Sequence, residues 1–316
     1  MKGLKKLALA TAVAAAPFAA QAELQAMDDS MMGNVTGQAG VTIELETQVS
    51  IGQFTYTDEG TFAVKDIELG GALTSDSASA AAYASATGAG TLLDELQIDI
   101  DVEDDGDAVI HVSSQQLSDP SDPNSAPVPI DWGFKAGSME LDGNGGENTV
   151  LVSNMDAWGL LGQLDIRVDT DDVDGQTGTG TLNIDAAFTV NEMNFDVEFL
   201  GIGVRGMTIN SSEAGGVQLG EAGLLEIFAE DSAAPTAEEQ TKVALAQAGF
   251  AIVGLDIYKG DGLGSNSAAT GALRIDVDDV LMDINVTETV IGGANIGTIG
   301  IDNLHISNTK LAVYGH

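Results

Sequence analysis

The chain of 316 residues contains no cysteine. It therefore has neither a disulfide to hold a small fold together nor the residue that carries a bacterial lipoprotein anchor. A chain of this length can bury a core large enough to fold without such links, as one large domain or two smaller ones.

Basic residues are scarce. Lysine and arginine number 11 against 49 aspartates and glutamates, so the formal net charge is −38. Such a field repels nucleic acid and anionic lipid head groups, and it favours solubility, cation binding or life at high ionic strength. We therefore expect no nucleic-acid partner.

Aromatic residues make up only 5% of the chain, and long apolar runs are missing beyond the first 22 residues. No later stretch approaches the ~18 apolar residues of a membrane helix, which predicts no integral membrane span. Only six prolines are present, and four of them lie in the segment DPSDPNSAPVP, residues 119–129. This segment reads as an extended connector.

Residues 1–22 have the pattern of a Sec-type signal peptide. Three lysines precede an apolar run of roughly a dozen residues, and Ala20-Gln21-Ala22 is a small-x-small cleavage site. We expect an exported protein whose mature chain starts near Glu23. The expected location is the cell surface or the exterior, with the periplasm less favoured.

Alternation of aliphatic and acidic residues is the main structural signal that follows. It is clear in VTIEL (41–45), LQIDIDV (96–102), LDIRVD (164–169) and LRIDV (273–277). Period-two alternation indicates strands with one buried and one solvated face. The sequence thus predicts an all-β protein with an N-terminal β region at 41–118 and a repetitive C-terminal β region at 130–316, separated by the connector.

A single surface helix is predicted near 237–248. Thr236 and Glu239 match a capping box, Val243 and Leu245 supply apolar positions, and Gly249 is suited to end the helix.

An eight-residue pattern, Φ-x-Φ-x-x-Φ-x-Φ with Φ apolar, recurs along the chain. Full copies begin at residues 62, 202, 250, 275 and 299, and weaker copies begin at 91 and 159. The last three full copies are spaced by 25 and 24 residues. This regularity favours a repetitive β-sheet architecture, either β-solenoid-like or an elongated antiparallel sandwich.

The x-x step in the middle of each copy carries a structural prediction. Side chains alternate between the two faces of a strand, so the apolar residues before and after the step should point in opposite directions. All four apolar residues can share one face only if the step contains a β-bulge or a corner. Each repeat is therefore predicted to bend in its middle.

Two loops rich in aspartate and glycine are candidate calcium sites, because calcium prefers six to eight hard oxygens from a flexible loop. An alternative is that Asp-Gly simply builds tight turns. The loops do not fit the helix–loop–helix template, since Val112 and Thr181 stand at the twelfth positions. The candidate ligands are Asp101, Asp105, Asp107, Asp169, Asp171, Asp172 and Asp174.

Catalytic constellations are not evident. The three histidines stand apart in sequence, and neither HExxH nor GxSxG occurs. A carboxylate-dependent hydrolase is the remaining enzymatic alternative, but 49 acids single out no pair. Trp132 and Trp158 fit a core better than a platform for sugars, although a glycan-binding role stays open on fold analogy. We expect no enzyme.

The segment between the leader and the first strand reads ELQAMDDSMMGNVTGQAG, residues 23–40. With the strand that follows, it resembles the opening of exported gammaproteobacterial pilus-system proteins of the FilA type and their relatives of unknown function. Those proteins show Leu-x-x-Leu-Asp-Asp-x-x-Leu-x-x-Val-Thr-Gly-Gln-x-Gly-Ile-x-Ile after the signal peptide. Met27 and Met31 or Met32 replace leucines here.

The resemblance covers about 20 residues of 316. It implies an exported, β-rich surface or fibre-associated protein, whose partners would be other surface or pilus components, or copies of itself. Independently of the resemblance, the apolar stripe at 24, 27, 31 and 35 indicates that residues 23–40 form a short cap that leads into the first strand and covers an open sheet end. The leading expectation is a structural or adhesive protein, such as a component of a pilus-like or biofilm system. A soluble calcium- or glycan-binding protein is the alternative.

Overall fold

The computed structural model describes residues 40–72, 92–118, 121, 127–143, 145–171, 180–211, 219–229 and 232–315. The chain divides into two compact units, residues 1–39 and 40–316, and the account below concerns the second unit. The predicted leader, the cap segment up to residue 39, and the candidate ligands Asp172 and Asp174 lie outside the described residues.

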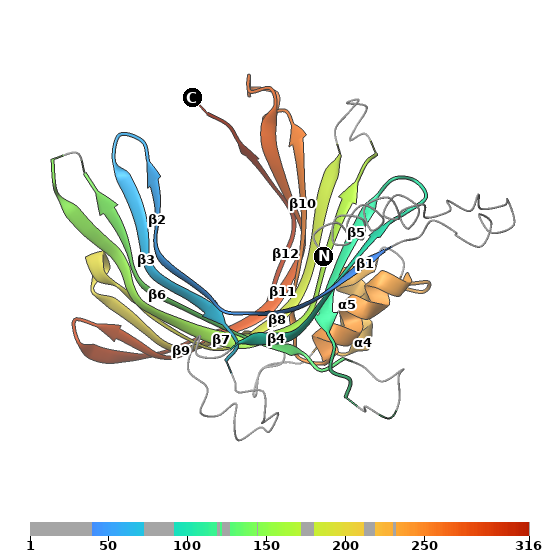
Figure 1. Cartoon of the computed structure of the whole chain (residues 1–316), viewed down its shortest axis with the longest axis horizontal. Helices are drawn as coiled ribbons and strands as arrows, with labels where there is room; N and C mark the ends of the chain where they lie inside the picture. The colour runs from blue at the N-terminus through green and yellow to red at the C-terminus, as the bar shows by residue number, and fades with distance from the viewer. Residues whose placement is uncertain are drawn as a thin grey trace, which may run out of the picture. The chain divides into compact units, whose positions relative to one another are not determined.

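The all-β prediction is confirmed, because the described strands form one antiparallel sheet (Figure 1). The twelve described strands have the following bounds. They are β1 (Val41–Thr47), β2 (Val49–Thr57), β3 (Thr61–Gly70), β4 (Leu93–Val102), β5 (Ala108–Ser114), β6 (Ile130–Asp142), β7 (Asn148–Asp169), β8 (Thr181–Val197), β9 (Ile202–Asn210), β10 (Ala251–Gly260), β11 (Ala272–Ile291) and β12 (Ala294–Val313).

The sheet has two arms that share four long strands. The helix-side arm has the strand order β1-β4-β5-β7-β8-β10-β11-β12. The bare arm has the order β2-β3-β6-β7-β8-β9-β11-β12, because β2 pairs with β3, β3 with β6, and β9 lies between β8 and β11. Strands from both sides of the predicted connector, 119–129, are therefore hydrogen-bonded to one another.

The arms meet where the strands bend, as the repeats predicted. The fifth residue of four copies has a left-handed backbone, with φ of 53° at Asp66, 56° at Glu95, 56° at Gly206 and 53° at Asn303. The copies that begin at 159 and 275 have a register shift at the same step. Six of the seven steps thus hold a corner or bulge, as predicted. The copy that begins at 250 is the exception, because β10 pairs with β8 without a register shift and places Ile252 and Leu255 on opposite faces.

Because of these corners, most apolar side chains lie on one face of the sheet along both arms. This face is called the apolar face here. One row of directly paired residues crosses the helix-side arm; it consists of Ile43, Ile98, Val112, Leu164, Ala186, Val253, Val280 and Ile306. Another row crosses the bare arm; it consists of Phe54, Val64, Met139, Val152, Val197, Ile202, Ile291 and Ala294.

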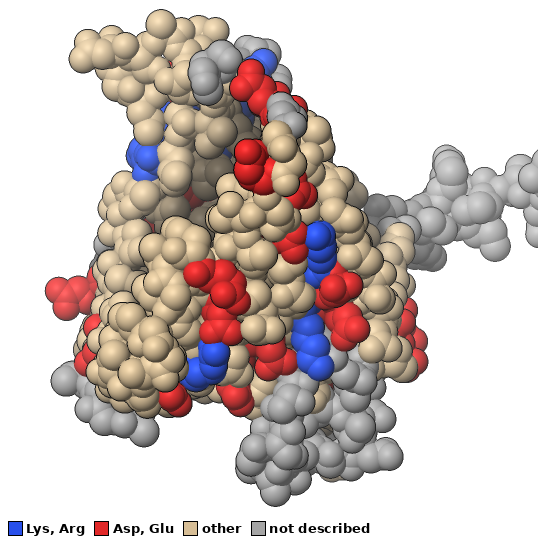
Figure 2. Space-filling model, turned by 90° about the vertical axis from the view of Figure 1, so that its left-hand side faces the viewer, with Lys and Arg blue, Asp and Glu red and all other residues tan. Residues whose placement is uncertain are grey.

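The opposite, polar face carries the acidic and basic residues. Figure 2 shows the side of the unit on which the bare arm lies, where Lys, Arg, Asp and Glu side chains gather next to one another. Lys65 donates to Glu140 there at 2.6 Å, and Arg205 pairs with Asp196 at 2.5 Å. These opposite charges on neighbouring strands attract each other and reduce the repulsion among the acidic residues of this face.

Two helices pack on the polar face of the helix-side arm, near the bend (Figure 1). They are α4 (Glu221–Phe228) and α5 (Ala237–Gln247). Leu224, Phe228 and Val243 of the helices form one buried cluster with Ile252 and Leu281 of the sheet. This cluster gives the helix-side arm a second layer.

The predicted helix near 237–248 is confirmed as α5, and its capping box is formed. Thr236 Oγ1 accepts from the backbone N–H of Glu239 at 3.2 Å, and the Glu239 carboxylate accepts from the backbone N–H of Thr236 at 2.6 Å. Helix α4 was not predicted from the sequence, because it is only eight residues long and has Gly220 at its N-cap without a side-chain cap. No helix in the described part of the chain is long and apolar enough to cross a membrane.

Candidate functional site: an acidic corner and the groove beside it

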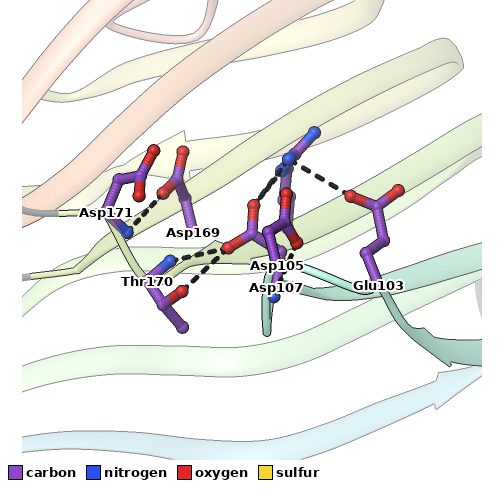
Figure 3. A network of polar contacts seen from close by, with 7 residues as sticks. Glu103, Asp105, Asp107, Asp169, Thr170 and Asp171 are labelled. Carbon is purple, nitrogen blue, oxygen red and sulfur yellow. Dashed lines mark hydrogen bonds and ion pairs between the residues drawn. The ribbon is translucent and has the colours of Figure 1, made fainter.

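The two aspartate-rich loops lie beside each other at the tip of the helix-side arm. Strand β5 follows the first loop and pairs antiparallel with the end of β7, with Ala108 opposite Val168. The first loop, between β4 and β5, is therefore next to the start of the second, residues 169–171, which is the part of that loop that the structure describes (Figure 3). Two stretches separated by about 60 residues in sequence thus form one acidic corner.

The first loop is a tight turn that requires its glycine. Glu103 donates its backbone N–H to the carbonyl of Asp107 at 2.7 Å, and Gly106 donates to the carbonyl of Glu103 at 3.0 Å. Gly106 has a φ of 101°, which a residue with a side chain rarely adopts. The turn places Glu103, Asp105 and Asp107 so that one carboxylate oxygen from each lies within 4.8 Å of the other two.

Asp107 is the centre of the corner. Its side chain is buried, and both of its carboxylate oxygens are engaged (Figure 3). Oδ1 accepts from the backbone N–H of Thr170 at 2.9 Å and from the Thr170 hydroxyl at 3.1 Å. Oδ2 accepts from Arg167 Nη2 at 2.5 Å and Nε at 3.0 Å. The hydrogen bond from Thr170, followed by the Arg167 guanidinium, lowers the pKa of Asp107.

Arg167 also reaches Glu103, whose carboxylate lies 3.3 Å from Nη2. The arginine therefore holds two of the three clustered carboxylates and fixes the β4–β5 turn against β7. Both arginine donors converge on Oδ2 of Asp107, and such charge-assisted hydrogen bonds are shorter and stronger than neutral ones. The corner therefore acts as a clamp between the two loops.

The candidate calcium ligands divide as follows. Asp105 and Asp107 are brought together with Glu103, whereas Asp101 is exposed on β4 and is not part of this group. Asp169 ends β7 and accepts from the backbone N–H of Asp171 at 2.7 Å, so this pair forms a local turn. Calcium needs six to eight oxygen ligands, but Arg167 already pairs with carboxylate oxygens of Glu103 and Asp107.

A groove of about 840 Å³ leads from the acidic corner toward α5, on the polar face of the helix-side arm. Its floor includes a row of directly paired polar residues, in which His111 lies opposite Asp165 and Asp165 lies opposite Asp185. Helix α5 forms one wall and contributes Lys242. Seven acids and two bases line the groove in addition to His111, so its charge favours a cationic occupant.

The histidine in this row has a carboxylate partner. His111 Nδ1 is hydrogen-bonded to Asp165, and that bond raises the pKa of His111. Sequence reasoning treated His111 as isolated, because Asp165 lies 54 residues further along the chain. The alternation of residues 164–169 placed Asp165 on the acidic face of its strand, but no such pattern was identified around His111, and nothing local identified their pairing.

Lys242, on α5, neutralises the charge of only some of the acidic residues that line the groove. Lys242 Nζ lies 2.9 Å from Asp185 and 3.1 Å from Glu238. Burial nevertheless raises the pKa of Asp185. Burial and the neighbouring Asp256 charge raise the pKa of Asp278 to about 6. The groove therefore holds two carboxylates, Asp185 and Asp278, whose charged form is destabilised by burial.

The tryptophans do not form a sugar platform together, since Trp158 is buried with only 5% of its surface exposed. Its position in the sheet instead confirms that Trp158 is a core residue.

Comparison with known proteins gives one match. The profile of a family described as "Family of unknown function (DUF6160)" matches residues 1–104. The match covers the segment on which the resemblance to FilA-type proteins rests, and its description names no pilus protein and no activity. No curated protein matches the chain, and no solved structure does. The first third of this chain is thus similar to a family whose own function is unknown.

Proposed function

We propose that this is an exported structural or adhesive protein of the cell surface or the extracellular space. In this role it associates with copies of itself or with other surface components, as in a pilus-like or biofilm system. The leader pattern of residues 1–22 and the resemblance of residues 23–40 support export and a surface location. The proposal assigns the protein no catalytic activity.

The observation that carries this proposal is the apolar face of the sheet. Both described α-helices pack on the polar face, and apolar residues remain exposed where the apolar face reaches its edges. Ile43 is 41% exposed, Phe54 is 54% exposed and Ile299 is 48% exposed. An exposed apolar surface of this extent usually marks an interaction site.

Surface labelling of intact cells, combined with electron microscopy of the released protein, tests the proposal. The chain is expressed with its own leader in a bacterial host, and a membrane-impermeant label is applied. We expect labelled protein on intact cells and oligomers or fibres in the released material. A monodisperse monomer that is labelled only after the outer envelope is opened would refute the proposal.

Calcium binding at the acidic corner is a second candidate, favoured by the three clustered carboxylates of Glu103, Asp105 and Asp107. A ligand that binds only the folded state at about 100 times its Kd adds about 2.7 kcal/mol to the free energy of unfolding. We expect millimolar calcium to raise the melting temperature.

Asp105→Asn supplies the control for calcium. This substitution removes a charged ligand and leaves the Arg167–Asp107 pair in place, so it should abolish the rise in melting temperature. An equal rise in both proteins would mean loose attraction of calcium to the acidic surface, and no rise in either would exclude the site.

A further inference from the structure

The sheet ends in two long edges, because no described strand pairs with the outer side of β1 and β2 or with the outer side of β12. One edge is formed by β1 and β2, which are separated only by Gln48, and the other by β12, of 20 residues. We infer that copies of the chain join head to tail, with β12 of one copy adding to the β1–β2 edge of the next. This inference rests on the proposed structural function and specifies its partner and surface.

Strand direction permits this arrangement. Every pairing in the sheet is antiparallel, and each arm contains eight strand positions between the β1–β2 edge and β12. Because eight is even, the first and last positions run in opposite directions. A copy placed next to β12 without being turned over therefore presents β1–β2 in the antiparallel direction that β12 requires.

The apolar rows define the register. The row that starts at Ile43 ends at Ile306, and the row that starts at Phe54 ends at Ala294. If both rows continue into the next copy, Ile306 lies beside Ile43 and Ala294 lies beside Phe54. Eleven positions separate the two residues on the β1–β2 edge and twelve separate those on β12. Relative to β11, β12 has one extra residue near Asn303 and another at Ile296, while β11 has one extra residue near Thr287, so β12 spans the two rows with one residue more than β11 does.

The same register brings charges of the polar face together. With Ile306 beside Ile43, the preceding His305 lies beside Glu44. His305 already faces Asp279 on its own sheet at 3.9 Å. The register thus places an imidazole of one copy beside a carboxylate of the next.

The edges have few of the devices that prevent strand addition. Neither β1, β2 nor β12 contains proline, and β12 has a single lysine, Lys310. The bulge near Asn303 lies where the two arms meet, so it shapes the sheet and does not only guard its edge. A long edge with exposed aliphatic residues is a site for pairing with another chain.

Head-to-tail addition is heterologous, since two different surfaces meet. Such contacts produce filaments, or rings when the rotation between copies closes. Two rivals use the same edges differently. In one, β12 pairs with β12 of a second copy and gives a closed dimer. In the other, the two edges of a single chain pair with each other.

Engineered cysteines separate these three arrangements, because the chain has no cysteine of its own. Paired residues of antiparallel strands have Cα atoms about 4.5–5.5 Å apart, within the range of a disulfide. The variants are Ile43→Cys and Ile306→Cys, prepared separately from the exported full chain. Circular dichroism of each variant checks that the sheet is intact.

We expect a covalent dimer under mild oxidation only when the two single variants are mixed, and a ladder of multimers from the double variant. Dimers from Ile306→Cys alone would show the closed β12 pair instead. An oxidised monomer from the double variant would show pairing within one chain. Absence of any cross-link in folded protein would refute edge pairing.

A second pair on the bare arm makes the test independent of the first. Phe54→Cys and Ala294→Cys should behave in the same way, because the same register joins both rows. Cross-linking of one pair without the other would refute the register.

Two lysine substitutions on β12 distinguish the inference from the proposed function. Ile306→Lys places a charge in the apolar row and should abolish assembly. Ser307→Lys places the same charge on the polar face and should leave assembly unchanged. If the protein assembles at the cell surface but neither the cysteines nor Ile306→Lys has an effect, only the head-to-tail inference fails. If the protein is a periplasmic monomer, the proposed function fails as well.

Discussion

The bare arm and the groove beside α5 on the helix-side arm shift the pKa of their acidic residues in opposite directions. On the bare arm, hydrogen bonds from Lys65 and two other side chains lower the pKa of Glu140 to about 2. In the groove beside α5, burial raises the pKa of Asp278 to about 6 and also raises that of Asp185. The tip of the helix-side arm behaves like the bare arm, because hydrogen bonds lower the pKa of Asp107 there.

The helices cause much of this difference. Helix α5 excludes water from the polar face of the helix-side arm, where acids outnumber bases around the groove. The bare arm has no described α-helix on its polar face, so each carboxylate there needs only a nearby base. Carboxylates with a raised pKa cluster at functional sites. The groove is therefore the part of the polar face best suited to bind a ligand.

The largest expected effect comes from removing the layer that distinguishes the arms. Phe228→Ala should lower the free energy of unfolding by about 3–5 kcal/mol, because Phe228 is buried between α4, α5 and the sheet. Phe54→Ala is the matched control on the bare arm, where the side chain is 54% exposed, and should cost far less. Urea titration measures both. Equal losses would mean that the helices contribute no separate core.

A smaller effect is expected at the corners, where the two arms should respond alike. Asn154 has a φ of 53° and Glu95 a φ of 56°. Valine at either position should lower the free energy of unfolding by roughly 1–3 kcal/mol relative to glycine, because a β-branched residue is strained in the left-handed region. Comparing valine with glycine cancels the loss of the native side chain. If the free energy of unfolding falls at only one of the two positions, the two arms do not both depend on a left-handed residue for their bend.

The smallest effects should have opposite signs on the two arms. Asp278→Asn should stabilise the protein at pH 7, because charged Asp278 opposes folding above about pH 6, and the gain should vanish as the pH falls toward 3.8. Since Asp278 is partly exposed, solvent screening keeps this gain small.

Glu140→Gln should instead destabilise the protein at pH 7. Charged Glu140 favours folding above about pH 4.5, and this contribution is lost as the pH falls toward 2. Melting temperatures of both variants and the parent at pH 4, 5.5 and 7 test the pair. Shifts of the same sign at pH 7 would contradict the contrast between the arms.

Local features of the fold were predictable because they depend on neighbouring residues. The capping box of Thr236 and Glu239 identified α5, and the mid-repeat step identified the corners, such as the one at Asp66. Helix α4 escaped prediction because its eight residues have no side-chain cap and make their main contacts with α5 and the sheet.

The candidate site was predictable only in part. Asp105 and Asp107 were identified from a turn-rich acidic stretch, and the structure places them together. Arg167 and Thr170, which engage Asp107, lie 60 and 63 residues further along the chain, and their role depends on the pairing of β5 with β7. No local pattern specifies that pairing.

The sequence by itself determined that the chain forms bent strands with one aliphatic and one acidic face, because alternation and steric limits on the backbone act within a few residues. Only the tertiary structure decided which strands pair, and with that the open sheet, its two unpaired edges and the groove under α5. Strand pairing is a contact between distant parts of the chain, so many orders satisfy the same alternation. The order observed here is the one that aligns the apolar rows from Ile43 to Ile306 and from Phe54 to Ala294.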